Sequence, residues 1–286
     1  MSAFTGRGRF SYEPVDGWGQ LPEGWEFKQV PGVAVDSKDR VYVFNRGSHP
    51  MIVFSREGEL ISSWGEGVFH NPHGAYIGKD DRIYCVDERD HTVRKFTLEG
   101  KLLQTLGRED QPGEAGTPFN RPTNVALSST GEIYVSDGYG NSRIHVFSPD
   151  GELLRSWGSF GDSPGKFNIP HGVWIYKDSR VLVADRQNNR IQVFDPYGNY
   201  LTQWTNLRRP CSIYIDNDEL VYVAELESRV SILSIDGEPL ESIGGVKSRE
   251  PGLFIAPHCA WVDSRGDLYV GEALEGQRIQ KFTRKR

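Results

Sequence analysis

The sequence predicts an all-β protein with the architecture of a six-bladed β-propeller, and three features support this prediction. One unit of about 40 to 50 residues recurs six times along the chain. Each unit contains short apolar runs and turn residues typical of four β-strands. No segment shows sustained helical periodicity. Each unit begins at a proline after a loop, and these prolines are Pro31, Pro72, Pro122, Pro170, Pro210 and Pro257.

The strands of each unit follow in the same order. The first strand is expected in runs such as residues 172–175, and the second follows a polar turn. The third is the clearest, because residues 143–147, 190–194 and 278–282 alternate between apolar and polar side chains. A fourth run follows a glycine turn, as in residues 151–158. Four such strands form one propeller blade.

The sixth unit lacks a fourth strand, because the sequence stops at Arg286 soon after the third. The amino-terminal segment Phe10–Gly19 ends like the other fourth strands. We therefore expect it to complete the last blade and to close the ring without an exposed sheet edge. The resulting prediction is a single propeller domain over residues 1–286.

The composition excludes several classes of partner. Among 286 residues, 33 Lys and Arg stand against 39 Asp and Glu, a formal net charge of -6. Nucleic acid and membrane lipids are therefore not expected partners. Residues 1–9 do not resemble a signal peptide, and no run approaches about 18 apolar residues. Three cysteines without CxxC spacing fit reduced thiols, so we expect a cytoplasmic protein; they are Cys85, Cys211 and Cys259. We also expect a monomer.

Residues that break the repeat are the best candidates for function. The residue after each repeat proline is, in order, Gly32, His73, Thr123, His171, Cys211 and His258. Histidine thus occupies alternate blades at the start of the innermost strand. Three imidazoles converging there would form the ligand set of a catalytic zinc site. The alternative is that these histidines only hydrogen-bond to loop carbonyls.

A second set of residues differs at the end of the second strand. Arginine occurs there in two blades, as Arg46 and Arg186, and guanidinium groups bind carboxylates bidentately. Tyr139 follows the same position in another blade. A phenol near two arginines and a metal could have its pKa of about 10 lowered enough to act as a base. The alternatives are a solvated arginine pair and a tyrosine that only packs on the rim.

The units resemble NHL repeats, and the chain as a whole is similar to the peptidyl-α-hydroxyglycine α-amidating lyase family. The likeness is densest in residues 121–125, 134–143 and 183–186. It implies that zinc is held by three histidines, that the catalytic residue is Tyr139, and that two arginines line the site. The histidines that match are His73, His171 and His258, and the arginines are Arg46 and Arg186.

The resemblance also implies a structural calcium ion and a disulfide. The calcium would be held by the backbone carbonyls of Val33 and Ala75 and by an aspartate after the third histidine, where this chain has Cys259. The disulfide of the secreted members corresponds to positions Asn120 and Gly140, which are not cysteines.

These features lead to one main hypothesis and two alternatives. The main hypothesis is a zinc lyase that cleaves an N-acyl-α-hydroxyglycine or related carbinolamide, a small molecule or peptide with a carboxylate, to an amide and glyoxylate. One alternative is a metal-dependent hydrolase of lactones or esters. The other is a non-catalytic NHL-repeat scaffold that binds a protein or peptide. No phosphate-binding glycine loop and no serine nucleophile elbow is present, which disfavours nucleotide chemistry and triad hydrolysis.

Overall fold

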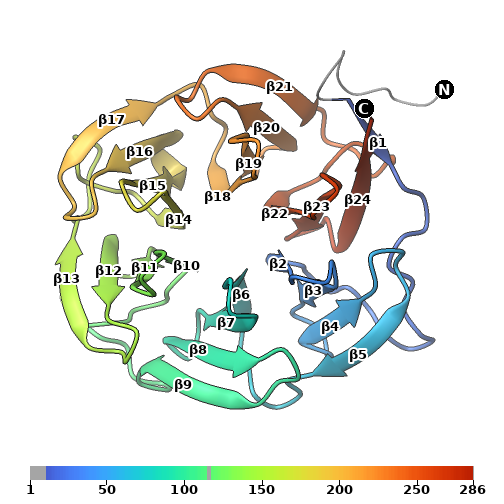
Figure 1. Ribbon diagram of the computed structural model, residues 1–286, viewed down its shortest axis with the longest axis horizontal. Helices are drawn as coiled ribbons and strands as arrows, with labels where there is room; N and C mark the ends of the chain where they lie inside the picture. The colour runs from blue at the N-terminus through green and yellow to red at the C-terminus, as the bar shows by residue number, and fades with distance from the viewer. Residues whose placement is uncertain (1–10, 115–116, 286) are drawn as a thin grey trace. The chain divides into compact units, whose positions relative to one another are not determined.

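The computed structural model describes residues 11–114 and 117–285, and these form a six-bladed β-propeller (Figure 1). Each blade is a four-stranded antiparallel sheet. The fold predicted from the repeats is therefore confirmed. Within the described ranges, the one helical element is the 3₁₀ turn η1 (Arg186–Asn188), and no helix is long and apolar enough to span a membrane.

By its internal contacts the chain divides into two compact units, Gly67–Ile213 and Met1–Glu66 with Tyr214–Arg286. The unit over residues 67–213 contains three complete blades. Their strands are β6 (Pro72–Ile77), β7 (Arg82–Asp87), β8 (Thr92–Thr97) and β9 (Leu102–Gly107); β10 (Asn124–Leu127), β11 (Ile133–Asp137), β12 (Arg143–Phe147) and β13 (Leu153–Trp157); β14 (Pro170–Tyr176), β15 (Arg180–Asp185), β16 (Arg190–Phe194) and β17 (Tyr200–Trp204).

The other three blades belong to the second unit, except that the first strand of one of them, β18, begins before the boundary. Their strands are β2 (Gly32–Val35), β3 (Val41–Phe44), β4 (Met51–Phe54) and β5 (Leu60–Trp64); β18 (Pro210–Ile215), β19 (Val221–Glu225), β20 (Arg229–Leu233) and β21 (Pro239–Gly244); β22 (Pro257–Val262), β23 (Leu268–Glu272), β24 (Arg278–Arg284) and β1 (Tyr12–Pro14).

The last blade is completed by the amino-terminal strand, as predicted. β1 pairs antiparallel with β24, and Tyr12 lies opposite Arg284. The strand is shorter than predicted, because Trp18 leaves the sheet and its ring packs against Phe54 and Tyr269. Phe10, where the predicted strand began, lies outside the described residues, as do residues 1–9. A single domain over residues 1–286 stays a prediction.

Buried aromatic side chains fill the space between neighbouring blades. Phe119, Phe167 and Phe254 lie in the loops that precede a repeat proline, and each is completely buried in a hydrophobic cluster. Aromatic burial removes a large apolar area from water. These side chains therefore fix each loop, and with it the residue that begins the next inner strand.

Candidate functional site

The histidines of the repeat lie at irregular positions in their strands. The pairing of β6 with β7 shifts between Pro72 and Ala75, and that of β14 with β15 shifts between Pro170 and Gly172. The β22 and β23 pair shifts in the same way around His258. No such shift occurs in the β2 and β3 pair or in the β10 and β11 pair, which carry no histidine there. Bulges redirect side chains next to functional sites.

Aspartate side chains hold the loop before each of two histidines by accepting hydrogen bonds from backbone amides. Asp87, at the end of β7, accepts from the amide of Asn71 at 2.9 Å. Asp185, at the end of β15, accepts from the amide of Asn168 at 2.8 Å. Each acid therefore ties the end of a second strand to the loop that leads into the first strand of its own blade.

A carbonyl group of the next blade orients each imidazole. The Nδ1 atom of His73 lies 2.6 Å from the carbonyl oxygen of Thr123, and that of His171 lies 2.9 Å from the carbonyl oxygen of Cys211. A carbonyl oxygen only accepts, so Nδ1 carries a proton, and in the neutral imidazole Nε2 is then the acceptor. Hydrogen bonds from the histidines to backbone carbonyls, the alternative from the sequence, are thus present at Nδ1.

Glycine makes this approach possible in two blades. A side chain at Gly74 would place its Cβ 2.8 Å from the carbonyl oxygen of Thr123, and one at Gly172 would place it 2.7 Å from that of Cys211. These are the carbonyl groups that receive the histidine protons. A larger residue after His73 or His171 would therefore clash with the carbonyl group that binds the histidine.

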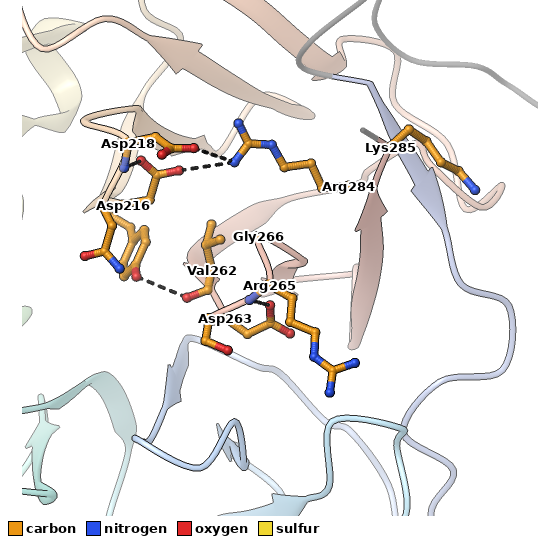
Figure 2. Close-up of a pocket in the computed structure, with 11 residues that line it drawn as sticks. Asp216, Asp218, Val262, Asp263, Arg265, Gly266, Arg284 and Lys285 are labelled. Atoms are coloured by element: carbon orange, nitrogen blue, oxygen red, sulfur yellow. Dashed lines mark hydrogen bonds and ion pairs between the residues drawn. The ribbon is translucent and has the colours of Figure 1, made fainter.

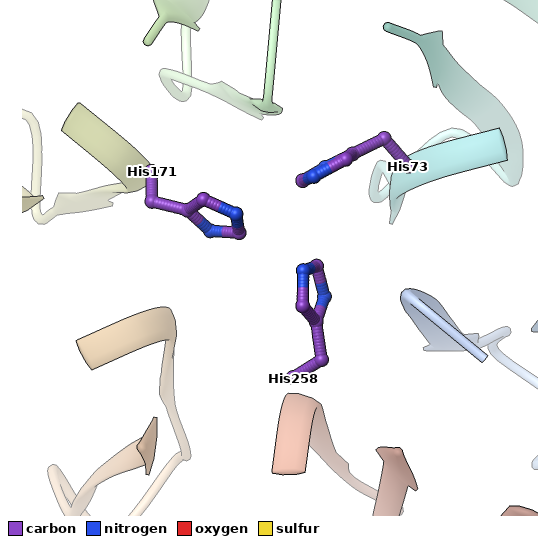
Figure 3. Close-up of side chains that lie close together, drawn as sticks. All are labelled: His73, His171 and His258. Atoms are coloured by element: carbon purple, nitrogen blue, oxygen red, sulfur yellow. The ribbon is translucent and has the colours of Figure 1, made fainter. Parts of the chain in front are cut away.

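The unit over residues 67–213 brings four of the predicted site residues together. The hydroxyl oxygen of Tyr139 lies 3.1 Å from Nε2 of His73 and 3.2 Å from Nε2 of His171. The two imidazole rings have centroids 4.8 Å apart, and Figure 3 shows them directed toward a common point. Arg186 donates from Nη1 to the same hydroxyl at 3.3 Å. Both histidines are buried.

His258 and Arg46 belong to the other unit and are described there. His258, the third imidazole drawn in Figure 3, is buried on β22, and its Nδ1 lies 2.9 Å from the carbonyl oxygen of Pro31. Its tautomer is therefore the same as that of His73 and His171. Arg46 is half-buried and donates from Nη1 to Oε1 of Gln29 at 2.7 Å.

The donor set fits a transition metal. Neutral imidazole whose Nδ1 proton is held by a carbonyl group offers Nε2 as a ligand atom that suits zinc and related ions. The calcium prediction fits less well. Cys259 stands where the resemblance places an aspartate, and its thiol donates to the carbonyl oxygen of Val30 at 3.5 Å. Calcium takes oxygen ligands, so a site at the Val33 and Ala75 carbonyls stays a prediction without its carboxylate.

Two opposing effects act on the pKa of Tyr139. Burial raises this pKa above its usual value, and the positive charge and hydrogen bond of Arg186 lower it in part. The effect of Arg186 has the direction expected from the sequence, and the lowering by two arginines and a metal together stays a prediction. Arg186 is only 8% exposed, and its Nε is buried without a hydrogen-bond partner. An unpaired guanidinium N–H beside a phenol suits an incoming anion.

Sequence reasoning missed Arg121 and Glu88. The guanidinium group of Arg121 lies 5.0 Å from the ring centroid of Tyr139, and that of Arg186 lies 5.3 Å from it. Glu88 pairs with Arg121 and is 4% exposed. Glu88 occupies the position at which two other blades carry Arg46 and Arg186. This difference between the blades is the sequence signal that could have identified Glu88.

A separate pocket of about 430 Å³ lies among β18, β22 and β24 and holds none of the predicted site residues (Figure 2). Its charged groups are largely paired, as Arg284 with Asp218 at 3.1 Å. The residues that line it are Tyr214, Asp216, Asn217, Asp218, Val262, Asp263, Ser264, Arg265, Gly266, Arg284 and Lys285.

Fold and site together define an NHL-repeat propeller with a histidine and tyrosine centre, and the NHL repeat family matches residues 119–147. The chain belongs to the family of NHL repeat-containing protein 3. It is 35% identical to the Mus musculus protein of that name over 274 residues, which cover 87% of this chain and 78% of that protein.

Other relatives carry the name of an enzyme. The chain is 36% identical to "Peptidyl-alpha-hydroxyglycine alpha-amidating lyase 1" of Drosophila melanogaster, over 79% of this chain and 47% of that protein. Among solved structures, a gluconolactonase of Xanthomonas campestris has a TM-score of 0.74 at 12% identity, covering 99% of this chain and 94% of that one. That likeness shows the fold alone. The family resemblance stated from the repeats is confirmed.

Proposed function

We propose that this protein is a metal-dependent carbon-nitrogen lyase that converts an N-acyl-α-hydroxyglycine, or a related carbinolamide, to an amide and glyoxylate. One observation carries the proposal. The hydroxyl oxygen of Tyr139 lies 3.1 Å from Nε2 of His73 and 3.2 Å from Nε2 of His171, and the buried Arg186 donates to the same oxygen. The lyase name of a 36% identical relative supports the reaction class.

His258 completes the metal centre in this proposal. It shares with His73 and His171 its place after a repeat proline, its bulged strand and its Nδ1 contact with a backbone carbonyl. Three neutral imidazoles leave a coordination position open, as in catalytic zinc sites. A zinc ion held there would supply Lewis-acid chemistry, lowering the pKa of a hydroxyl group that reaches it.

The side chains of the protein perform the remaining steps. Arg186, together with Arg46, binds the substrate carboxylate and orients the carbon-nitrogen bond. Tyr139 is the base that takes the proton of the substrate hydroxyl, and the positive charge of an ion held by the histidines would favour the phenolate form that this step requires. The carbon-oxygen double bond of glyoxylate then forms as the carbon-nitrogen bond breaks, and the electron pair leaves with the amide nitrogen. That nitrogen gains the proton that Tyr139 took from the hydroxyl, so the reaction is balanced without water or a redox partner.

Glyoxylate release from α-hydroxyhippurate tests the proposal. We expect turnover by the purified protein, loss of turnover after chelation, and recovery with added zinc. Elemental analysis of the same preparation is expected to give about one transition-metal ion per chain, the stoichiometry of a single closed site, and none in His171→Ala.

Each alternative predicts a different result. Hydrolysis of a lactone or ester without glyoxylate release would identify a hydrolase and contradict the lyase proposal. A protein with neither activity, and with no metal bound before or after zinc addition, would be a binding scaffold.

A further inference from the structure

We propose that the ion pair of Glu88 and Arg121 is a positioning device that holds the ring of Tyr139 so that its hydroxyl faces His73 and His171. The catalytic meaning of that position rests on the proposed lyase function. All the contacts that carry the inference lie within residues 67–213, a single compact unit.

The backbone alone holds Tyr139 weakly. The residue stands between Gly138 and Gly140 in the turn after β11, and as a whole it is only partly buried. Its amide donates to the carbonyl oxygen of Arg121 at 3.3 Å, which is longer than the usual 2.9 to 3.0 Å. A side chain in such a turn needs further contacts to keep one orientation.

Arg121 supplies such a contact. Its guanidinium group lies 5.0 Å from the ring centroid of Tyr139, within the range of about 6 Å for a cation-π interaction. Because the carbonyl group of Arg121 also receives the Tyr139 amide, one residue contacts both the backbone and the ring of Tyr139.

Glu88 fixes Arg121 in turn. The Nε and Nη2 atoms of Arg121 donate to Oε2 and Oε1 of Glu88, at 2.9 and 3.2 Å, a two-point pair that restricts the plane of the guanidinium group. Asn71 donates to Oε1 of the same carboxylate at 2.7 Å. Glu88 is 4% exposed, and a carboxylate at this depth requires a cationic partner. The side chain of Arg89, with its Nε 3.8 Å away, is 72% exposed and fixes it less well.

The repeat offers a matched control in Arg209. Like Arg121, it precedes a repeat proline, and both have a positive φ, 52° and 62°. The amide of Arg209 donates to Oδ1 of Asn189, a side chain of the previous blade, at 2.9 Å. Its Nε donates to the neutral amide of Gln187 at 3.1 Å, and in the part of the chain that the structure describes it covers no aromatic ring.

The kinetic test compares Arg121→Ala and Glu88→Gln with Arg209→Ala. We expect kcat to fall about 10- to 100-fold in the first two, since a displacement near 1 Å can cost this much, with KM within twofold. Arg209→Ala is expected to stay within twofold in both constants. In a Tyr139→Phe background, Arg121→Ala is expected to cost less than about twofold, because the hydroxyl that it positions is already gone.

A second measurement is independent of turnover. The protein labelled with 3-fluorotyrosine gives a ¹⁹F signal for each of its 12 tyrosines, and Tyr139→Phe assigns the signal of Tyr139. We expect this signal to shift or broaden in Arg121→Ala and Glu88→Gln and to be unchanged in Arg209→Ala. Glu88→Gln keeps the side-chain volume, so it tests the pair even where Arg121→Ala folds poorly.

Three results would overturn the inference. They are an unchanged Tyr139 signal in both variants, an increase of KM with constant kcat, and an equal loss of kcat in the Tyr139→Phe background. A wild-type protein that releases no glyoxylate would refute the proposed function, and the ¹⁹F measurement would still decide whether the pair positions Tyr139.

Discussion

At the scale of single residues, the histidines show how a repeated sequence is converted into a site. The bulge redirects each side chain, the following glycine admits a neighbouring carbonyl group in two blades, and that carbonyl takes the Nδ1 proton. A fixed tautomer removes the competition between the two ring nitrogens. His73 and His171 are therefore held with Nδ1 against a carbonyl group and Nε2 toward Tyr139.

Tyr139→Phe tests the role of the phenol. We expect kcat for glyoxylate release to fall by about 10²- to 10⁴-fold, the contribution of a positioned acid or base. Metal content is expected to stay at the wild-type level, because backbone carbonyl groups still orient the imidazole rings of His73 and His171 in this variant. Kinetics and elemental analysis of one preparation measure both. Loss of the metal in this variant would mean that Tyr139 serves the metal site rather than proton transfer.

At the scale of elements, the outer strand of a blade is its least buried part. In β13 the side chains of Leu153 and Leu154 are exposed, so apolar burial contributes little there. Arg155 in the same strand donates to both oxygens of Glu132 at 3.1 Å and to the hydroxyl of Tyr134 at 2.8 Å. This polar cluster ties the outer strand back to β11 and the residue before it.

Glu132→Gln should therefore reduce stability in a pH-dependent way. Hydrogen bonding from Arg155 lowers the pKa of Glu132, so the charged form stabilises the fold at neutral pH. This contribution is complete above the unfolded pKa and disappears as the pH falls through the lowered folded value. We expect a loss of about 0.5 to 1 kcal/mol at pH 7, measured by urea unfolding.

The difference between Glu132→Gln and wild type should approach zero in acid. Glu99→Gln, at an exposed turn, is the matched control and is expected to change stability by less than about 0.5 kcal/mol. A constant difference between Glu132→Gln and wild type across the whole pH range would show that the charge of Glu132 is not the cause.

At the scale of the whole molecule, the two ends of the chain share one sheet. β1 is the outer strand of the blade formed by β22, β23 and β24. Tyr12 is 1% exposed, and its hydroxyl lies 2.8 Å from that of Tyr222 in a common hydrophobic cluster. The amino-terminal strand thus contributes to the core as well as covering the edge of β24.

Tyr12→Ala is expected to destabilise the protein by about 3 to 5 kcal/mol, the usual cost of removing a large buried aromatic side chain. Denaturant unfolding measures this loss. Tyr197→Ala, at a residue that is 78% exposed, is the control and is expected to change stability by less than about 0.5 kcal/mol. Equal unfolding midpoints for the two variants would contradict a structural role for β1.

The fold and the site differ in how far the sequence predicts them. Repeated prolines and alternating strands identify the propeller, because every blade obeys the same rules of strand pairing. Residues that break the repeat identify His73, His171, Tyr139 and Arg186, which the structure brings together. The same comparison does not identify Arg121, because its partner Glu88 lies 33 residues away in the preceding blade.

The sequence by itself therefore determined the class of fold, the completion of the last blade by the amino-terminal strand, and the residue types of the candidate centre. Only the tertiary structure decided the Nδ1 contacts of His73 and His171, the pairing of Glu88 with Arg121 and the raised pKa of Tyr139. The physical reason is that strand periodicity is local, whereas tautomers, ion pairs and desolvation depend on atoms contributed by neighbouring blades.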